Sequence, residues 1–291
     1  MYIEINGKQI TRFQIFEKKP KLWIWLCINF VFFWFSTQSL LIGFIISFII
    51  YTAIVNLALS NLIERILRRL YDVRHLATNR EKERLENLFE EVYAKAMKKS
   101  EHLKNHKINL YIQDTVSINA FAIGKNTIVI TRGLMETMND DEIKAILAHE
   151  FAHIANGDTQ LSLLISIASN IYLWLFMLVR LVINIFKNLQ EDENILGSIA
   201  SFVDWVMGIA VTLATLIANI AIMSYFRETE YIADKYAYSL GYGSEMISAL
   251  YKFYDMQISD KKHLLDRIQD SHPKVAFRIE ALENMENYSY L

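Results

Sequence analysis

The chain has 291 residues, and its 30 basic and 32 acidic side chains give a formal net charge of −2. This near balance excludes nucleic acid as an expected partner, because nucleic-acid-binding proteins carry a basic excess concentrated on one face. Hydrophobic residues make up 53% of the chain, a share that favours membrane-spanning segments. The single cysteine, Cys27, excludes a disulfide within the chain.

Residues 22–63 follow a polar N-terminal segment, 1–21, and carry no formal charge. As one helix they would be about 63 Å long, roughly twice the hydrocarbon thickness of a bilayer. Polar residues at 36–39 divide the stretch, so it predicts two spans, 22–36 and 40–60, joined by a tight turn. A secretory signal peptide is the alternative, but the stretch is too long and no small-residue cleavage site follows its first half.

A soluble part is expected to begin at residue 64. Residues 79–105 are charged but carry an apolar stripe, which predicts an amphipathic helix with its stripe in the core. The stripe consists of Leu85, Leu88, Phe89, Val92 and Ala96. Short runs at 108–112, 117–123 and 127–131 are rich in strand-forming residues and predict a small β-sheet.

The most informative motif follows this sheet and reads His149-Glu150-Phe151-Ala152-His153. Two histidines four positions apart project from one face of a helix, so both imidazoles can reach a single metal ion. The adjacent carboxylate lies off that line, where it can take a proton from a water held at the metal. A chance match on a surface helix is the alternative. Against it, residues 139–142 are typical of a capped helix start and 156–157 of a helix end.

A second pair of spans is predicted at 161–179, extending to 186, and at 205–223. Basic residues cluster before the first span and after the second, and the positive-inside rule then places both termini and the metal motif in the cytoplasm. These clusters are Arg12, Lys18, Lys19 and Lys21, and Arg65, Arg68, Arg69 and Arg74. The expected organisation is a cytoplasmic segment 1–21, a membrane hairpin 22–63, a first cytoplasmic part 64–160 that carries the metal motif, a second hairpin 161–223 and a second cytoplasmic part 224–291.

Arg180 and Asp204 are charges close to membrane depth, where an unpaired charge is costly. Counted from the cytoplasmic ends of the third and fourth spans, they fall at the same outer depth of an antiparallel hairpin. We expect them to form a pair. Independent contacts with the membrane interface are the alternative.

The third metal ligand is expected just after the fourth span. Glu230 and Asp234 share a helical face there, so one carboxylate can bind metal and the other can brace a ligating histidine. We assign Glu230 as the ligand and Asp234 as the brace. A solvated charged turn is the alternative interpretation.

Together these motifs resemble the HtpX family of membrane zinc metallopeptidases, relatives of the CAAX prenyl endopeptidase. The resemblance rests on four motifs in order: 119–124, 149–158, 230–234, and Ser271-His272-Pro273 with Arg278-Ile279. It covers nearly the whole chain. Two departures are Lys274, where the family commonly has a second proline, and the roughly 21 residues that precede the first span.

The resemblance implies roles for the matching positions. One Zn²⁺ per chain would be held by His149, His153 and Glu230, with Glu150 as general base and Asp234 beside a ligand. His272 would steady the oxyanion, and Arg227 is a further candidate for that charge. Substrate backbone would pair with an edge strand made of Asn119, Ala120, Phe121, Ala122 and Ile123.

The predicted fold class is therefore mainly α with a small β-sheet, as four transmembrane helices plus a cytoplasmic zincin-like metallopeptidase domain. The predicted function is zinc endoproteolysis of misfolded or damaged membrane proteins in the inner membrane, with protein or peptide substrates and the lipid bilayer as partners. An intramembrane or prenyl-peptide-processing metalloprotease and a non-catalytic zinc-binding scaffold are the alternatives. The oligomeric state is not predicted.

Overall fold

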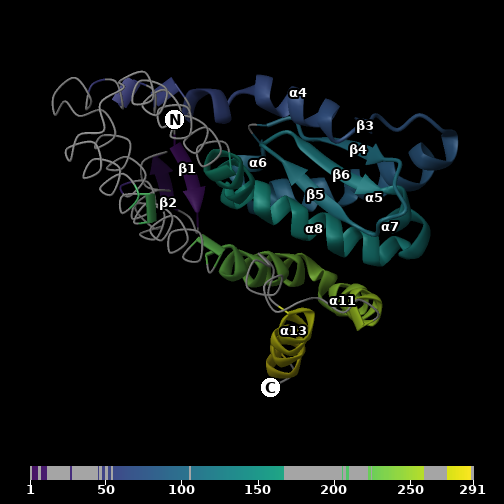
Figure 1. Cartoon of the computed structure of the whole chain (residues 1–291). Coiled ribbons are helices and arrows are strands. Elements are labelled where there is room, and N and C mark those ends of the chain that lie inside the picture. The colour runs from purple at the N-terminus through teal and green to yellow at the C-terminus, as the bar shows by residue number, and fades with distance from the viewer. Residues whose placement is uncertain are drawn as a thin grey trace. The chain divides into compact units, whose positions relative to one another are not determined.

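The computed structural model describes residues 2–5, 8–11, 27, 45, 48–49, 52–53, 55–104, 106–166, 205, 208–209, 222–223, 225–258 and 274–289 (Figure 1). The chain forms two compact units. One comprises Met1–Ile15, Leu59–Leu163 and Met223–Leu291, and the other comprises Phe16–Ala58 and Leu164–Ile222. The elements described below belong to the first unit, and they confirm a mainly helical fold with a small mixed sheet.

The four predicted spans lie mostly outside the described residues, as do Arg180 and Asp204. Among the residues that are described, no helix is both long and apolar enough to cross a membrane.

A four-stranded sheet lies at the centre of the first unit. It consists of β3 (Val73–Arg74), β4 (Asn109–Gln113), β5 (Ala120–Ile123) and β6 (Thr127–Thr131), in the order β3-β4-β6-β5. Strand β6 runs parallel to β4 and antiparallel to β5, and all five of its residues are buried. Such a continuous apolar run suits a central strand covered on both faces. Strand β5 therefore forms one edge of the sheet.

Strand β5 begins at Ala120, later than the predicted 117, because Thr131 holds the residue before it. The backbone N–H of Asn119 donates to the Thr131 hydroxyl at 2.9 Å, and the Thr131 N–H donates to the Asn119 carbonyl at 3.0 Å. The β-hairpin β1 (Tyr2–Ile5) and β2 (Lys8–Thr11), which pairs antiparallel, was not predicted.

Helices cover both faces of the sheet. On one face, α5 (Asn79–Lys99) and α8 (Asp140–Asn156) pack on Leu110, Ile112, Ile128 and Ile130. The predicted stripe of α5 is buried in this core, although the helix ends at Lys99 and a short helix, α6 (Glu101–Lys104), follows. On the other face, Leu67 of α4 (Asn61–Leu70) packs on Tyr111 and Val129.

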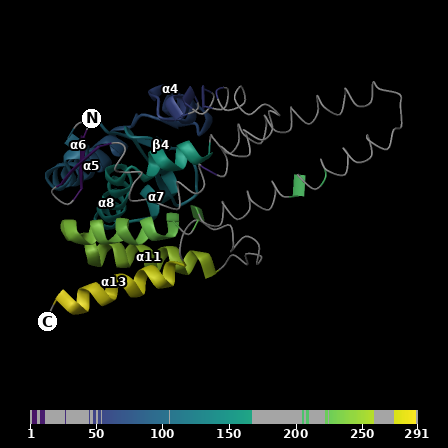
Figure 2. The same cartoon turned by 90° about the vertical axis from the view of Figure 1, so that its left-hand side faces the viewer.

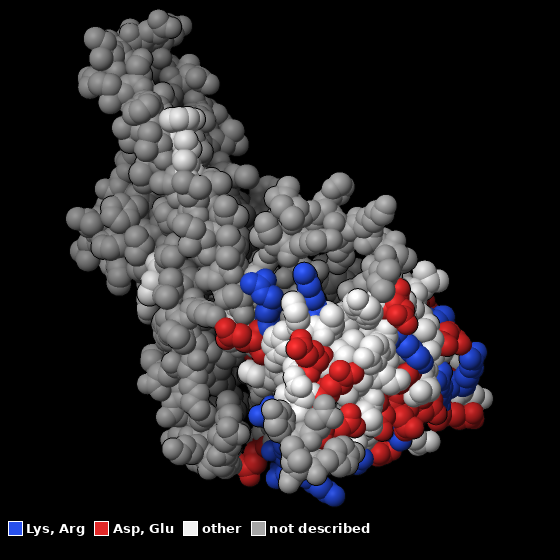
Figure 3. Space-filling model, turned by 90° about the horizontal axis from the view of Figure 1, so that it is seen from below, with Lys and Arg blue, Asp and Glu red and all other residues white. Residues whose placement is uncertain are grey.

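The remaining helices lie on the α8 side of the molecule. A helix at 225–237 continues into the π-helical turn η1 (Tyr238–Tyr242), which leads to α11 (Gly243–Ile258). Helices α11 and α13 (Val275–Ser289) lie side by side (Figure 2). Acidic and basic side chains are interspersed over the described part of the face in Figure 3.

Helix α4 also holds the turn between β5 and β6. The buried Glu64 carboxylate accepts hydrogen bonds from the Asn126 backbone N–H at 3.2 Å and the Thr127 hydroxyl at 2.6 Å. Gly124 has a φ of +61°, and a Cβ there would lie 2.8 Å from Glu64 Oε2. The Thr159 hydroxyl, from the helix that follows α8, donates to the Gly124 carbonyl. The turn at the end of the edge strand is thus held from two helices.

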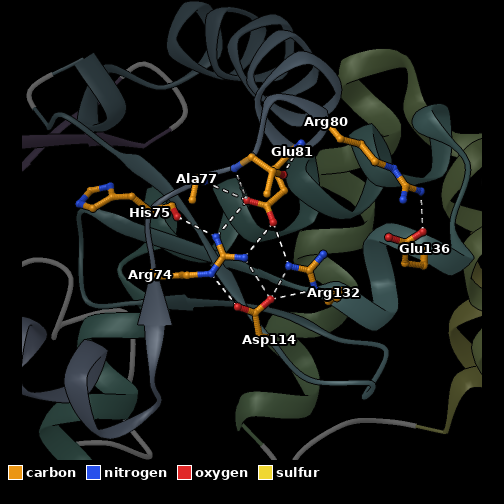
Figure 4. A network of polar contacts seen from close by, with 9 residues as sticks. Arg74, His75, Ala77, Arg80, Glu81, Asp114, Arg132 and Glu136 are labelled. Atoms are coloured by element: carbon orange, nitrogen blue, oxygen red, sulfur yellow. Dashed lines mark hydrogen bonds and ion pairs between the residues drawn. The ribbon is translucent and has the colours of Figure 1, made fainter.

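A network of four charged side chains, Arg74, Glu81, Asp114 and Arg132, lies where β3 and β4 end and where α5 and α7 (Arg132–Thr137) begin (Figure 4). Glu81, fully buried at the start of α5, accepts two hydrogen bonds from Arg74 at 2.8 and 2.9 Å and one from Arg132 at 2.9 Å. Both arginines also bind Asp114, which follows β4. The network ties β3, α5, β4 and α7 together, and Arg74 lowers the pKa of Glu81 well below its ordinary value.

We predict that Glu81 makes the fold acid-sensitive. A carboxyl with a lower pKa in the folded chain contributes stability above its unfolded pKa, about 4.3, and loses that contribution as the pH falls toward the folded value. Urea unfolding in detergent should therefore show a larger drop in midpoint between about pH 6 and about pH 3 for the parent chain than for Glu81→Gln. The exposed Glu83→Gln is the control, and an equal acid response in parent and Glu81→Gln would refute the assignment.

Candidate metal centre

The candidate centre is built on helix α8. Asn139 and Glu142 form a reciprocal capping box at its start, and Gly157 ends it in the left-handed conformation with a φ of 72°. Both predicted helix boundaries are therefore confirmed. Within the helix, the Nε2 atoms of His149 and His153 face each other at 3.1 Å.

The later carboxylate reaches this histidine pair. Glu230, on the helix at 225–237, places Oε2 3.5 Å from His149 Nε2 and Oε1 3.5 Å from His153 Nε2. One ligand atom from each of the three side chains lies within 4.8 Å of the others. Two atoms bound tetrahedrally to one zinc ion at about 2.0–2.1 Å lie about 3.3 Å apart. The donor set and its spacing therefore fit zinc with a fourth position left for water.

Asp234 contacts the ring nitrogen of His149 that does not face the other candidate ligands. The His149 Nδ1 lies 2.9 Å from Asp234 Oδ1, and both side chains are buried. A hydrogen bond at Nδ1 fixes the ring so that Nε2 faces the other candidate ligands. Burial alone would lower the pKa of His149, but Asp234 and Glu230 raise it. The surrounding carboxylates thus favour positive charge at this position, as a proton or as a metal ion.

A second acid stands in the same relation to His153. Asp158, buried just beyond α8, has Oδ2 3.5 Å from His153 Nδ1 and accepts a hydrogen bond from the Tyr225 hydroxyl at 2.8 Å. Asp158 lies within the quoted motif, but we assigned it no role from the sequence. The available signal was its place one residue after the helix-ending Gly157.

Sequence reasoning also missed the role of Arg278. This buried arginine of α13 contacts both later carboxylates: Nη1 lies 2.9 Å from Glu230 Oε2, and Nε and Nη2 bind Asp234 at 2.7 and 2.6 Å. Burial alone would raise the pKa of Asp234, but Arg278 lowers it below its ordinary value. The available signal was a single charge within the apolar start of α13, 275–279.

The other predicted site residues fall into four cases. Glu150 is buried on α8, and its charge acts on His153 and Arg278. Strand β5 lies at the sheet edge against α8, with Asn119 just before it. Arg227 is half-buried on the helix that carries Glu230, and its contact with the site stays untested. His272 lies outside the described residues.

Two helices therefore bring a HExxH histidine pair and a later glutamate together beside the edge of a small sheet, a metallopeptidase-like centre. Comparison with known families agrees, since the model for peptidase family M48 matches residues 79–286. The chain belongs to peptidase family M48.

Curated relatives confirm the resemblance drawn from the motifs. Protease HtpX of Haemophilus ducreyi is 31% identical over 194 residues, which are 61% of this chain and 66% of that protein. A Protease HtpX homolog of Nitrosomonas europaea is 29% identical over 193 residues, 60% of this chain and 64% of that protein. The chain thus matches slightly less than two thirds of these relatives' length. A crystal structure of S. mikatae Ste24p aligns with a TM-score of 0.48 and 18% identity, covering 91% of this chain and 62% of that one.

We predict that Asp234→Asn weakens zinc binding about 10- to 100-fold, because the His149 ring loses the carboxylate that orients it. Competition with a chromophoric chelator measures the affinity, and circular dichroism checks that the variant is folded. Asp255→Asn is the matched control, because Asp255 is exposed on α11. Unchanged zinc affinity in a folded Asp234→Asn protein would contradict the brace.

Proposed function

We propose that this chain is an integral membrane zinc endopeptidase, with its active site on the cytoplasmic side, that hydrolyses peptide bonds of misfolded or damaged membrane proteins. The observation that carries the proposal is the meeting of His149, His153 and Glu230 at zinc-ligand spacing, with Glu150 buried next to His149. Membership of a peptidase family and relatives named Protease HtpX support the class of reaction.

In this proposal each side chain has a definite task. His149, His153 and Glu230 hold the metal, and bound zinc supplies a Lewis acid that lowers the pKa of a water and polarises a carbonyl. Glu150 takes the proton from the attacking water and passes it to the leaving amine. His272, and Arg227 as a second candidate, would stabilise the negative charge that develops on the carbonyl oxygen.

The edge of the sheet supports a main-chain mode of substrate binding. Strand β5 pairs with β6 on one side, and no strand of the described chain pairs with its other side. An extended substrate could add to this edge through backbone hydrogen bonds, with Asn119, Ala120, Phe121, Ala122 and Ile123 as the binding segment. Such bonds are indifferent to side-chain identity, which suits a protease acting on damaged proteins of varied sequence.

The alternatives fit these observations less well. An intramembrane protease would place the histidine helix within the bilayer, whereas α8 begins with Asp140, Asp141 and Glu142 and belongs to the same compact unit as the sheet. A scaffold that only binds zinc has no need of the buried carboxylate Glu150, which can accept a proton. Prenyl-peptide processing is the remaining alternative, and the substrates in the trapping experiment below decide it.

We predict that two variants separate catalysis from metal binding. Glu150→Gln should abolish casein degradation, a loss of at least about a hundredfold, while retaining zinc, because only the proton acceptor is removed. Glu230→Ala should lose both, because it removes a ligand. Zinc content is measured on purified protein, and casein degradation is assayed with and without chelator. Full zinc retention in Glu230→Ala, or chelator-resistant proteolysis by the parent, would contradict the proposal.

We also predict which substrates the inactive Glu150→Gln protein captures. Crosslinking in cells that express Glu150→Gln should enrich membrane proteins, and more of them after a treatment that misfolds such proteins. Mass spectrometry identifies the captured chains, with Glu150→Gln/Glu230→Ala as a control that lacks an intact metal site. Capture dominated by soluble proteins would exclude the quality-control role, and capture of prenylated peptides would favour the alternative.

A further inference from the structure

Helix α4 has one face directed into the protein and one directed outward. Glu64 and Leu67 face inward, to the β5–β6 turn and to the sheet. On the outward face, Leu62, Ile66 and Leu70 follow each other at intervals of four residues and are 48%, 40% and 74% exposed. Residues spaced by four lie one above another along a helix, so these three form an apolar row on the surface.

A basic row runs beside the apolar one. Arg65 and Arg69 are exposed, and neither has an acidic partner in the described part of the chain. By contrast, Arg74, Arg84 and Arg132 each form ion pairs with carboxylates. The helix's only acid, Glu64, is buried on the inward face, so no negative charge of α4 neutralises the row.

Helix α4 has an N-terminal cap of its own. Ser60 has an extended backbone, and its hydroxyl caps the helix by accepting from the Ile63 N–H at 3.4 Å. The helix therefore begins at its own cap, directly after the predicted second span, 40–60.

We propose that the outward face of α4, defined by Leu62, Arg65, Ile66, Arg69 and Leu70, rests on the bilayer surface and binds the phosphates of anionic phospholipids. An apolar row would enter the boundary between headgroups and acyl chains, and the adjacent guanidinium groups would bind phosphate oxygens. Two arginines without an acidic partner among the described residues, next to exposed apolar side chains, fit this occupant by charge and by polarity. The inference rests on the membrane location given under Proposed function.

The single native cysteine makes the contact measurable. In a Cys27→Ser background, the full chain carries an environment-sensitive fluorophore at Ile66→Cys and is reconstituted into vesicles of phosphatidylcholine or of an equimolar mixture with phosphatidylglycerol. A quencher attached to lipid and iodide in water report the two environments. We expect lipid quenching in the anionic vesicles and iodide quenching in phosphatidylcholine alone.

Charge removal tests the arginines. Arg65→Gln/Arg69→Gln should reduce the ratio of lipid-contacting to water-exposed label about fivefold per arginine. Arg80→Gln/Lys82→Gln on α5 removes the same charge from exposed positions and should leave the ratio unchanged. A label at Val116→Cys, on a side chain that is 94% exposed in the loop before β5, should stay accessible to iodide in both vesicles.

The outcomes separate this inference from the proposed function. The inference would be overturned if iodide quenched the label at Ile66→Cys as strongly as the label at Val116→Cys in both kinds of vesicle. It would also be overturned if the lipid-attached quencher acted equally on the Ile66→Cys label in the two compositions. If the chain resists alkaline extraction and degrades casein in those cases, only the α4 contact is lost. A chain removed from the vesicles by alkaline washing would overturn both the contact and the membrane location.

Discussion

The charge balance around Glu230 and Asp234 is the constraint on which the rest of the site depends. Both carboxylates are buried, and an ionised group taken out of water costs several kcal/mol unless opposite charge and hydrogen bonds compensate it. Arg278 supplies that compensation, with two hydrogen bonds to Asp234 and an ion pair with Glu230. A planar guanidinium suits this task because its donors point in fixed directions. The late helix α13 is therefore part of the candidate metal centre, although it provides no candidate ligand.

The two candidate histidine ligands each contact a carboxylate through Nδ1, but at different distances. Each directs Nε2 to the centre and Nδ1 to a carboxylate, at 2.9 Å for His149 with Asp234 and at 3.5 Å for His153 with Asp158. Tyr225 holds Asp158 in turn. Because Tyr225, Glu230 and Asp234 come from one helix, that helix positions both rings and provides the third candidate ligand. The candidate site is thus built from side chains on whole helices.

Residue spacing predicted the parts of this site that lie within one element. The histidine pair and Glu150 follow from helical periodicity, and the capping residues 139–142 fixed where α8 begins. Glu230 and Asp234 could be grouped by their interval of four and assigned as ligand and brace, and the family resemblance implied the same two roles. Arg278 stands out as a single charge in an apolar run, but its partners could not be predicted, because nothing local shows that α13 meets a helix that begins some fifty positions earlier.

The basic cluster after the second predicted span shows the same limit. Arg65, Arg68, Arg69 and Arg74 look alike in the sequence, yet Arg68 lies against Glu64 and Arg74 joins the network of Glu81 and Asp114. The other two, Arg65 and Arg69, are exposed, and no acidic side chain of the described residues pairs with them. Contacts in the folded chain decide which of these charges are structural and which are available to a membrane. The positive-inside rule alone cannot separate the two kinds.

The inward face of α4 matters because the proposed substrate strand must be rigid. Backbone pairing requires an edge whose donors and acceptors hold their positions, since ordering a loose strand would offset the gain from each new bond. Thr131 holds Asn119 at the start of β5, and Glu64 with Thr159 holds the turn at its end. A side chain at position 124 would collide with Glu64. Because Gly124 has none, the turn can lie against α4 without a steric clash. The helix that we place on the lipid surface is therefore also one of the two that hold the turn at the end of the edge strand, through Glu64.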